Sequence, residues 1–177
     1  MIQEGKTIRS VGETRLSTSV TVNKYKQLEQ QEDKQAIAAF IVERFDERYF
    51  NPVMNSSSKH GFTMMAVGCL VIETLESFYQ GLLDTKGHSR RMFTDFFARE
   101  TPLKPFGNVG DFFTDIRCGI LHQAEIRGGW RITRKIDAPL LDSVDKIINT
   151  ELFIRELRVA VLKCSFSPRC SRQSRVE

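Results

Sequence analysis

The sequence has few of the residues on which metal sites and disulfide frameworks depend. Its 177 residues include four cysteines and three histidines. The cysteines form no Cys-x-x-Cys pair, and the histidines show no metal-ligand spacing. We therefore expect no structural zinc, no other metal and no cofactor. Because no N-terminal signal peptide is visible, we also expect reduced cysteines in a cytoplasmic protein.

Long apolar runs and nucleotide-binding signatures are lacking as well. The longest apolar run, residues 61–72, is too short to cross a bilayer and is interrupted by Glu73, so we expect no membrane association. The chain has no phosphate-binding glycine loop and no Ser, His and Asp set in a recognisable context. Its formal net charge of +4 is compatible with nucleic acid but is a weak electrostatic footprint.

The hydrophobic residues recur at helical spacing, which predicts an all-α bundle of four or five helices. The pattern predicts an amphipathic helix over residues 36–49, ending before Pro52, and a final helix that opens at residue 142 or 143. Residues 62–83 are apolar around most of a helix circumference, as is typical of a helix at the centre of a bundle. Thirteen phenylalanines against one tryptophan indicate aromatic packing between helices. Alternation near residues 130–136 predicts at most a short β element.

The organisation we expect is one helical domain over residues 23–164, with a tail at each end. Residues 1–22 mix Ser, Thr, Gly and charged residues, which favours a mobile N-terminal arm. Residues 165–177 are polar and basic and contain Pro168, which favours a disordered basic tail.

Residues 109–125 contain the candidate chemistry. The pattern predicts one helix that ends at the pair Gly128-Gly129 and carries Arg117 and His122. On an ideal helix these two residues lie about 140° apart around the axis and about 7.5 Å apart along it. They can meet if the helix is distorted, which Gly119 makes easier, or if a second copy brings an Arg and a His together across a dimer axis.

An imidazole and a guanidinium are the minimum needed for an RNA 2′-hydroxyl to attack its own phosphodiester without a metal. Histidine exchanges protons near neutral pH, and arginine offers a planar fork of donors that matches phosphate. The alternative is that Arg117 pairs with a carboxylate, for which Glu73 is the candidate, and that His122 is a surface histidine. The nearby polar residues that we select as supporting the pair are Asp115, Cys118 and Glu125.

The segment Arg117-Cys-Gly-Ile-Leu-His122 resembles the Arg-(four to six residues)-His motif of the HEPN superfamily of small helical-bundle domains. Many members are metal-independent ribonucleases of toxin–antitoxin, phage-defence and CRISPR-linked systems. The resemblance implies that Arg117 and His122 form a catalytic pair, that the protein is a homodimer, and that an antitoxin protein is a partner. The sequence departs from the family at Cys118, where a polar residue is common, and at Ala124, where one toxin branch has a tyrosine.

A basic segment follows the motif and is the predicted RNA-binding surface. Its members are Arg127, Trp130, Arg131, Arg134 and Lys135. A basic, tryptophan-containing segment suits single-stranded RNA, and it equally suits an edge strand protected by charge. A second basic group, His88, Arg90 and Arg91, either contacts phosphate or forms a solvated helix start. The two hypotheses for function are a metal-independent endoribonuclease and a non-catalytic helical module that binds RNA, a nucleotide or a protein.

Overall fold

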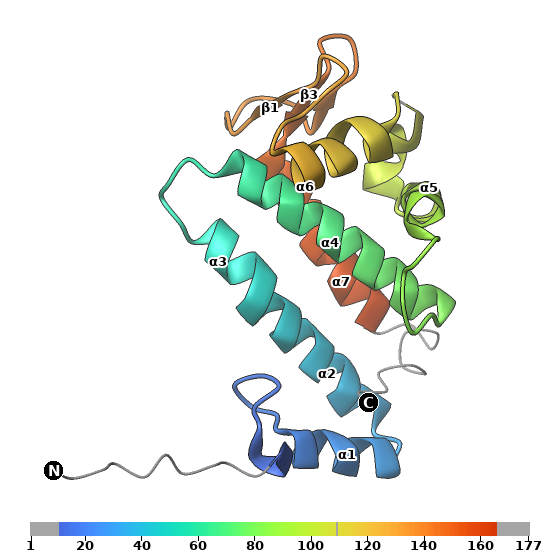
Figure 1. Cartoon of the computed structure of the whole chain (residues 1–177). Coiled ribbons are helices and arrows are strands. Elements are labelled where there is room, and N and C mark those ends of the chain that lie inside the picture. The colour runs from blue at the N-terminus through green and yellow to red at the C-terminus, as the bar shows by residue number, and fades with distance from the viewer. Residues whose placement is uncertain (1–10, 109, 166–177) are drawn as a thin grey trace, which may run out of the picture.

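The structure is a computed structural model that describes residues 11–108 and 110–165. Within these residues the fold is mostly helical, with one small sheet (Figure 1). The α-helices are α1 (Val22–Gln30), α2 (Lys34–Phe45), α3 (Asn51–Met54), α4 (Gly61–Gln80), α5 (Ser89–Arg99), α6 (Gly119–Gln123) and α7 (Thr150–Ser165). The first ten residues of the predicted arm, and the predicted basic tail from residue 166 onward, lie outside the described residues.

Helix α4 lies at the centre of the bundle, as its apolar circumference predicts. It packs against α5, α6 and α7 (Figure 1). Gly68 allows a close approach to α7, because a Cβ there would lie 2.8 Å from Cε1 of Phe153. By length and composition alone α4 could cross a membrane, but half of its most apolar window is buried inside the bundle. A core helix passes the same test, so the feature is weak evidence of a membrane.

Phenylalanine rings join the second half of the chain to this core. Phe97 of α5, Phe106 of the 3₁₀ segment η3 (Thr101–Asn108), Phe112 and Phe153 of α7 pack together with ring centroids 5.0–5.9 Å apart. Such pairs stabilise by about 0.5–1.5 kcal/mol each beyond the area they bury. The expected aromatic packing between helices is confirmed, and it fixes the start of the segment that carries Arg117.

The described residues contain seven α-helices, more than the four or five predicted. Part of the difference comes from two π-helical segments, η2 (Asp46–Phe50) and η4 (Phe113–Cys118), which interrupt stretches that the sequence pattern shows as continuous. Pro52 does not end the first of these stretches, because it lies in the first turn of α3, where a missing backbone N–H is tolerated.

The sheet is larger than predicted. Strands β1 (Arg131–Thr133), β2 (Leu141–Asp142) and β3 (Ile147–Asn149) lie in the order β1-β3-β2, with β3 parallel to β1 and antiparallel to β2. The final helix therefore begins at Thr150 rather than at residue 142 or 143. The apolar residues at 147 and 148 suit either a helix or a buried strand, and the Asn149 side chain separates the two elements by accepting a hydrogen bond from the Leu152 amide at 3.3 Å.

Residues 11–21, which we expected to belong to a mobile arm, pack against α2. Val20 and Ser17 are buried. The carboxylate of Glu43 accepts hydrogen bonds from the Ser19 amide at 2.9 Å and from the Ser17 hydroxyl at 3.1 Å. The packed domain therefore includes residues before 23, because hydrogen bonds to the Glu43 carboxylate and the burial of Val20 hold them in place.

The cysteines differ from one another in state. Cys69 and Cys118 have free thiols, whereas Cys164 is disulfide-bonded, so the expectation of reduced cysteines is wrong for Cys164. Burial raises the pKa of the Cys69 thiol well above its ordinary value. Cys69 therefore stays protonated at neutral pH and acts as a packing residue.

Candidate active site

Arg117 and His122 meet within one chain. Nη1 of Arg117 lies 3.3 Å from Nε2 of His122. Arg117 belongs to the π-helical segment η4, and His122 belongs to α6, which follows without a break. Hydrogen bonds in a π-helix link residues five positions apart, so the wide turn favours this separation where an ideal α-helix does not. No second copy of the chain is needed to bring the two groups together.

Gly119 is the residue that allows the chain to fold back at this point. A Cβ at Gly119 would lie 2.4 Å from the backbone oxygen of Glu125, which is too close for any other residue. The reversal is completed by Ala124, which ends α6 in the left-handed conformation with φ 55°. The motif helix therefore ends well before the predicted Gly128-Gly129 pair, and Glu125 lies in the turn after it.

Glu73 of α4 holds Arg117 from the other side. Nε of Arg117 donates to Oε1 of Glu73 at 2.7 Å, and the two side chains are only 17% and 13% exposed. The ion pair considered from the sequence is thus present. Burial disfavours the guanidinium charge, but the hydrogen bond and attraction from Glu73, with help from Cys118, raise the pKa of Arg117. The hydroxyl of Ser89 donates to the second oxygen of Glu73 at 3.3 Å.

His122 is exposed at the surface, with Nε2 turned toward Arg117. Because the guanidinium can only donate, Nε2 accepts in this contact and the neutral ring carries its proton on Nδ1. Among the described residues, Nδ1 of His122 has no hydrogen-bond partner. The imidazole is therefore accessible to a ligand from solvent.

Arg90 also belongs to this site, although the sequence analysis grouped it only with His88 and Arg91. Its guanidinium donates to Asp111 at 2.6 Å and to the Thr114 hydroxyl at 2.7 Å. It also lies 4.9 Å from the ring centroid of Phe113, whose ring is 5.3 Å from the Arg117 guanidinium. Despite an opposing effect of partial burial, the Arg90 contact and the Thr114 hydrogen bonds lower the pKa of Asp111 to about 2.

Arg127 approaches the same π-helical segment from the turn after α6. Its guanidinium donates to the backbone oxygen of Thr114 at 3.2 Å, and its amide donates to the backbone oxygen of Asp115 at 3.0 Å. Arg90 and Arg127 therefore both reach Thr114, from α5 and from the turn. With Arg117 they place three guanidinium groups around η4, which is a denser cationic site than the sequence indicates.

The three predicted supporting residues have separate surroundings. Cys118 is half-buried and interacts with the Arg117 side chain. The Asp115 carboxylate lies against Gly128, where a Cβ would be 2.2 Å from Oδ2. The Glu125 carboxylate accepts a hydrogen bond from the Ile126 amide at 3.0 Å. Asp115 and Glu125 thus organise the turn that carries Arg127, and Cys118 is the one in contact with the Arg–His pair.

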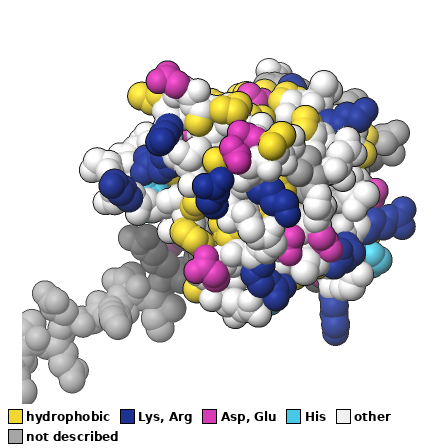
Figure 2. Space-filling model, turned by 90° about the horizontal axis from the view of Figure 1, so that it is seen from above, with side chains coloured by type: hydrophobic (Ala, Val, Ile, Leu, Met, Phe, Trp, Pro, Cys, Tyr) yellow, Lys and Arg dark blue, Asp and Glu magenta, His cyan; other side chains and the backbone are white. Residues whose placement is uncertain are grey.

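The predicted RNA-binding segment does not form one surface. Trp130 is only 5% exposed, so its ring packs in the core and is unavailable for stacking on a base, contrary to the sequence prediction. Arg131 donates to the backbone oxygen of Asp145 at 3.2 Å. Arg134 donates to Glu151 of α7 at 2.6 Å. Figure 2 shows basic side chains dispersed among apolar and acidic ones on the face that carries the sheet.

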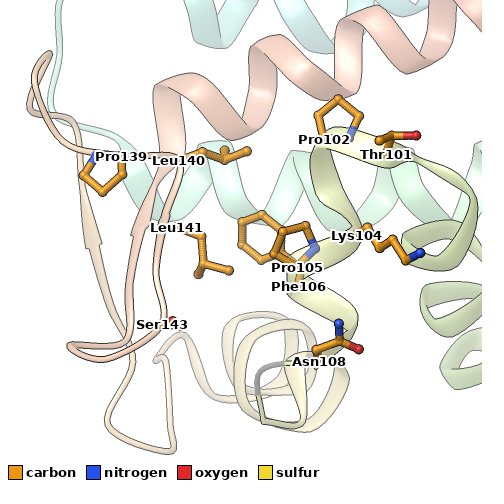
Figure 3. Close-up of a pocket in the computed structure, with 10 residues that line it drawn as sticks. All are labelled: Thr101, Pro102, Lys104, Pro105, Phe106, Asn108, Pro139, Leu140, Leu141 and Ser143. Atoms are coloured by element: carbon orange, nitrogen blue, oxygen red, sulfur yellow. The ribbon is translucent and has the colours of Figure 1, made fainter.

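A separate pocket of about 620 Å³ lies between η3 and the segment leading into β2. Its walls are mainly apolar, with Pro105 and Phe106 on one side and Leu140 and Leu141 on the other (Figure 3). None of its lining residues belongs to the Arg117–His122 site. The described residues contain no group of three or more His, Cys, Asp and Glu side chains arranged to hold a metal.

Comparison of the chain with protein-family models, with curated proteins and with solved structures finds no match.

Proposed function

We propose that this protein is an endoribonuclease of the HEPN type, in which Arg117 and His122 act on RNA without a metal ion. The observation that carries the proposal is the 3.3 Å contact between Nη1 of Arg117 and Nε2 of the exposed His122. A base and a phosphate-binding cation within reach of one another, at a surface open to solvent, are what transesterification of RNA requires.

The reaction uses His122 as the proton acceptor. On RNA binding, Nη1 of Arg117 turns from the imidazole to the scissile phosphate, which frees Nε2. Nε2 takes the proton of the 2′-hydroxyl, the 2′-oxygen bonds to phosphorus, and the bond from phosphorus to the 5′-oxygen breaks. The departing 5′-oxygen takes up a proton from water, and the His122 imidazolium later returns its proton to solvent. The products are a 2′,3′-cyclic phosphate and a 5′-hydroxyl, and the Arg117 fork stabilises the charge that develops on the phosphate oxygens.

Glu73 acts as a positioning residue for Arg117. Its contact is with Nε at 2.7 Å, which leaves Nη1 of the guanidinium facing His122. A guanidinium fixed at Nε loses less conformational freedom when it binds phosphate. The neighbouring guanidinium groups of Arg90 and Arg127 would bind further phosphates of the same strand.

A second copy of the chain is the partner that we propose for the surface near this site. Three large apolar side chains, Phe62 and Leu70 of α4 and Leu121 of α6, are 42%, 41% and 45% exposed. Leu121 is the neighbour of His122, so a homodimer formed here would set two such pairs close together. A cytoplasmic toxin or phage-defence context, with an antitoxin protein as a further partner, is the setting in which such a ribonuclease would act.

The second candidate function is a non-catalytic module that binds RNA, a nucleotide or a protein. The low exposure of both members of the Arg117–Glu73 ion pair favours it, because a largely buried ion pair often serves the fold alone. In that case Arg117 is structural and His122 is an ordinary surface histidine.

Cleavage of a fluorescent oligoribonucleotide separates the two functions. The full-length wild type, His122→Ala and Arg117→Ala would be assayed in buffer containing EDTA, with Gln123→Ala as a control that alters the exposed neighbour of His122. We expect cleavage by the wild type and by Gln123→Ala, and a loss of at least a hundredfold in the other two variants. Equal cleavage by His122→Ala and wild type, with both folded by circular dichroism, would refute the catalytic role.

The homodimer has its own test in analytical ultracentrifugation. Leu121→Asp is expected to shift the protein toward the monomer, because a charge in an apolar interface is costly to desolvate. Val159→Asp is the matched control, since Val159 lies on α7 and is 41% exposed. A wild type that is monomeric at all concentrations would remove the dimer from the proposal.

A further inference from the structure

A second cationic pocket lies apart from the Arg117–His122 site, between the loop after β1 and the first turns of α7. Its volume is about 350 Å³. Its lining includes Arg134, Lys135, Ile136, Glu151, Leu152 and Arg155. The sequence analysis assigned Arg134 and Lys135 to one RNA-binding segment with Arg127 and Trp130, but in the structure they line this separate pocket.

The pocket has more positive charge than its own carboxylate can neutralise. Arg134 is held in place, with Nε donating to Glu151 at 2.6 Å and Nη1 donating to the backbone oxygen of Ser58 at 2.6 Å. Within the described part of the chain, the Lys135 ammonium and the Arg155 guanidinium have neither an ion-pair nor a hydrogen-bond partner. Three cations therefore face one carboxylate, and two of the cations are free to bind an anion.

The same pocket contains aliphatic surface. Ile136 is 94% exposed, and Leu152 is half-buried. Isolated apolar residues at a surface are common. Here, however, Ile136 and Leu152 line the cavity together with Lys135 and Arg155, which suits a ligand with an anionic group on a less polar body. A nucleotide unit of RNA has this composition.

Contacts with α4 and with the residues before it relate the pocket to the Arg117–His122 site. Arg134 contacts Ser58, just before α4 begins at Gly61, and Arg117 contacts Glu73 further along the same helix. The twelve residue steps from 61 to 73 correspond to about 18 Å of helix. At about 3.4 Å per stacked nucleotide, roughly five nucleotides span this length.

We infer that this pocket binds a phosphate group of RNA through Lys135 and Arg155, with the attached nucleoside against Ile136. The ligand's identity as RNA rests on the proposed function, whereas binding of the anion itself does not. The phosphate is either a terminal phosphate or a phosphodiester of the backbone, and both present the same oxygens to these cations.

The test compares Lys135→Gln/Arg155→Gln with Lys24→Gln/Lys26→Gln in the full-length protein. The control pair removes the same charge from α1, which lies at the opposite end of the molecule from the sheet (Figure 1). Both pairs would be made in the His122→Ala background, so that a labelled twelve-nucleotide RNA stays intact. Its dissociation constant would be measured by fluorescence anisotropy at several salt concentrations.

Loss of the one phosphate contact to a single strand should lower the slope of log affinity against log salt by about 0.7 and weaken binding about tenfold near physiological salt. The control pair should change neither quantity by a comparable amount. If the two double variants have the same slope and the same affinity, the pocket does not bind RNA phosphate and the inference is overturned. Repeating the titration with 5′-phosphorylated and 5′-hydroxyl RNA assigns the contact to a terminal or a backbone phosphate.

Failure of RNA binding at this pocket can be distinguished from failure of the proposed ribonuclease function. Binding in the His122→Ala background requires no cleavage, so the pocket can pass this test in a protein that is not a nuclease. Conversely, a nuclease that depends on Arg117 and His122 can show no response to Lys135→Gln/Arg155→Gln, which would reject the pocket alone.

Discussion

The ion pair between Arg117 and Glu73 allows a structural role for Arg117 to be separated from a catalytic one. Glu73→Gln keeps the shape of the side chain and removes its charge, while Arg117→Met keeps much of the length and removes the guanidinium. Each single substitution leaves the other partner largely buried, at 17% or 13% exposure, without its counter-charge. The double variant removes both charges.

The expected magnitude follows from the burial and the 2.7 Å contact. Hydrogen bonds to charged groups contribute about 1.5–3 kcal/mol, and breaking a fully buried pair costs about 3–5 kcal/mol. Because both side chains retain some contact with solvent, we expect each single variant to lose about 2 kcal/mol of unfolding free energy. For a domain of this size that corresponds to a fall of about 4–8 °C in Tm. The double variant should recover about 1–2 kcal/mol relative to the sum of the singles.

Urea unfolding of the four proteins, followed by circular dichroism, measures this coupling. The control is the exposed pair Arg91 and Asp95, whose side chains are 78% and 37% exposed and which should couple by about 0.5 kcal/mol or less. Additive effects of Glu73→Gln and Arg117→Met, or single losses below about 0.5 kcal/mol, would refute the reasoning. If the double variant is as stable as the wild type and fails to cleave RNA, Arg117 has a role beyond the fold.

Three further predictions test the geometry around the site. Gly119→Ala should destabilise the protein by about 1–3 kcal/mol in thermal unfolding, because the new Cβ would lie 2.4 Å from the Glu125 backbone oxygen. A Gly119→Ala variant with the Tm of the wild type would contradict this close approach. The pKa of Asp111 is lowered to about 2 from 3.8, so its carboxylate should add stability above pH 4 that is lost as the pH falls toward 2. The 43% exposure of this side chain limits the contribution to about 1 kcal/mol. An Asp111→Asn variant whose stability has the same pH dependence as that of the wild type would rule out this contribution. The emission of Trp130 should be that of a buried indole and should not change when RNA is added, whereas quenching by RNA would show that the ring is accessible.

The sequence predicted the central helix and the nature of the core because burial leaves a clear hydrophobic pattern. Residues 62–83 are apolar around the helix, and α4 is central for that reason. The π-helical segment η4 could not be predicted in the same way, since five-residue hydrogen bonding leaves no periodic signature in so short a stretch. The pattern at Ile147 and Ile148 was equally compatible with a helix, and only pairing with β1 and β2 made it a strand.

The candidate site was predicted in part. Arg117, His122 and Glu73 were selected by residue type and position, and the structure brings the three side chains together. The contribution of Arg90 depends on α5 lying beside η4, which is a tertiary contact that no local pattern encodes. The placement of Trp130 failed for a related reason, because a tryptophan in a basic segment carries no indication of which neighbours cover its ring.

The most direct test of the central claim uses an RNA with a single 2′-deoxy substitution. The protein would be incubated in EDTA with an oligoribonucleotide, and the cleaved position would be mapped and then replaced by its 2′-deoxy form. If Arg117 and His122 promote attack by the adjacent 2′-hydroxyl, the unmodified RNA yields a 2′,3′-cyclic phosphate and the substituted RNA is not cut at that position. Cleavage that continues at the 2′-deoxy position, or that leaves a 5′-phosphate, would contradict the account.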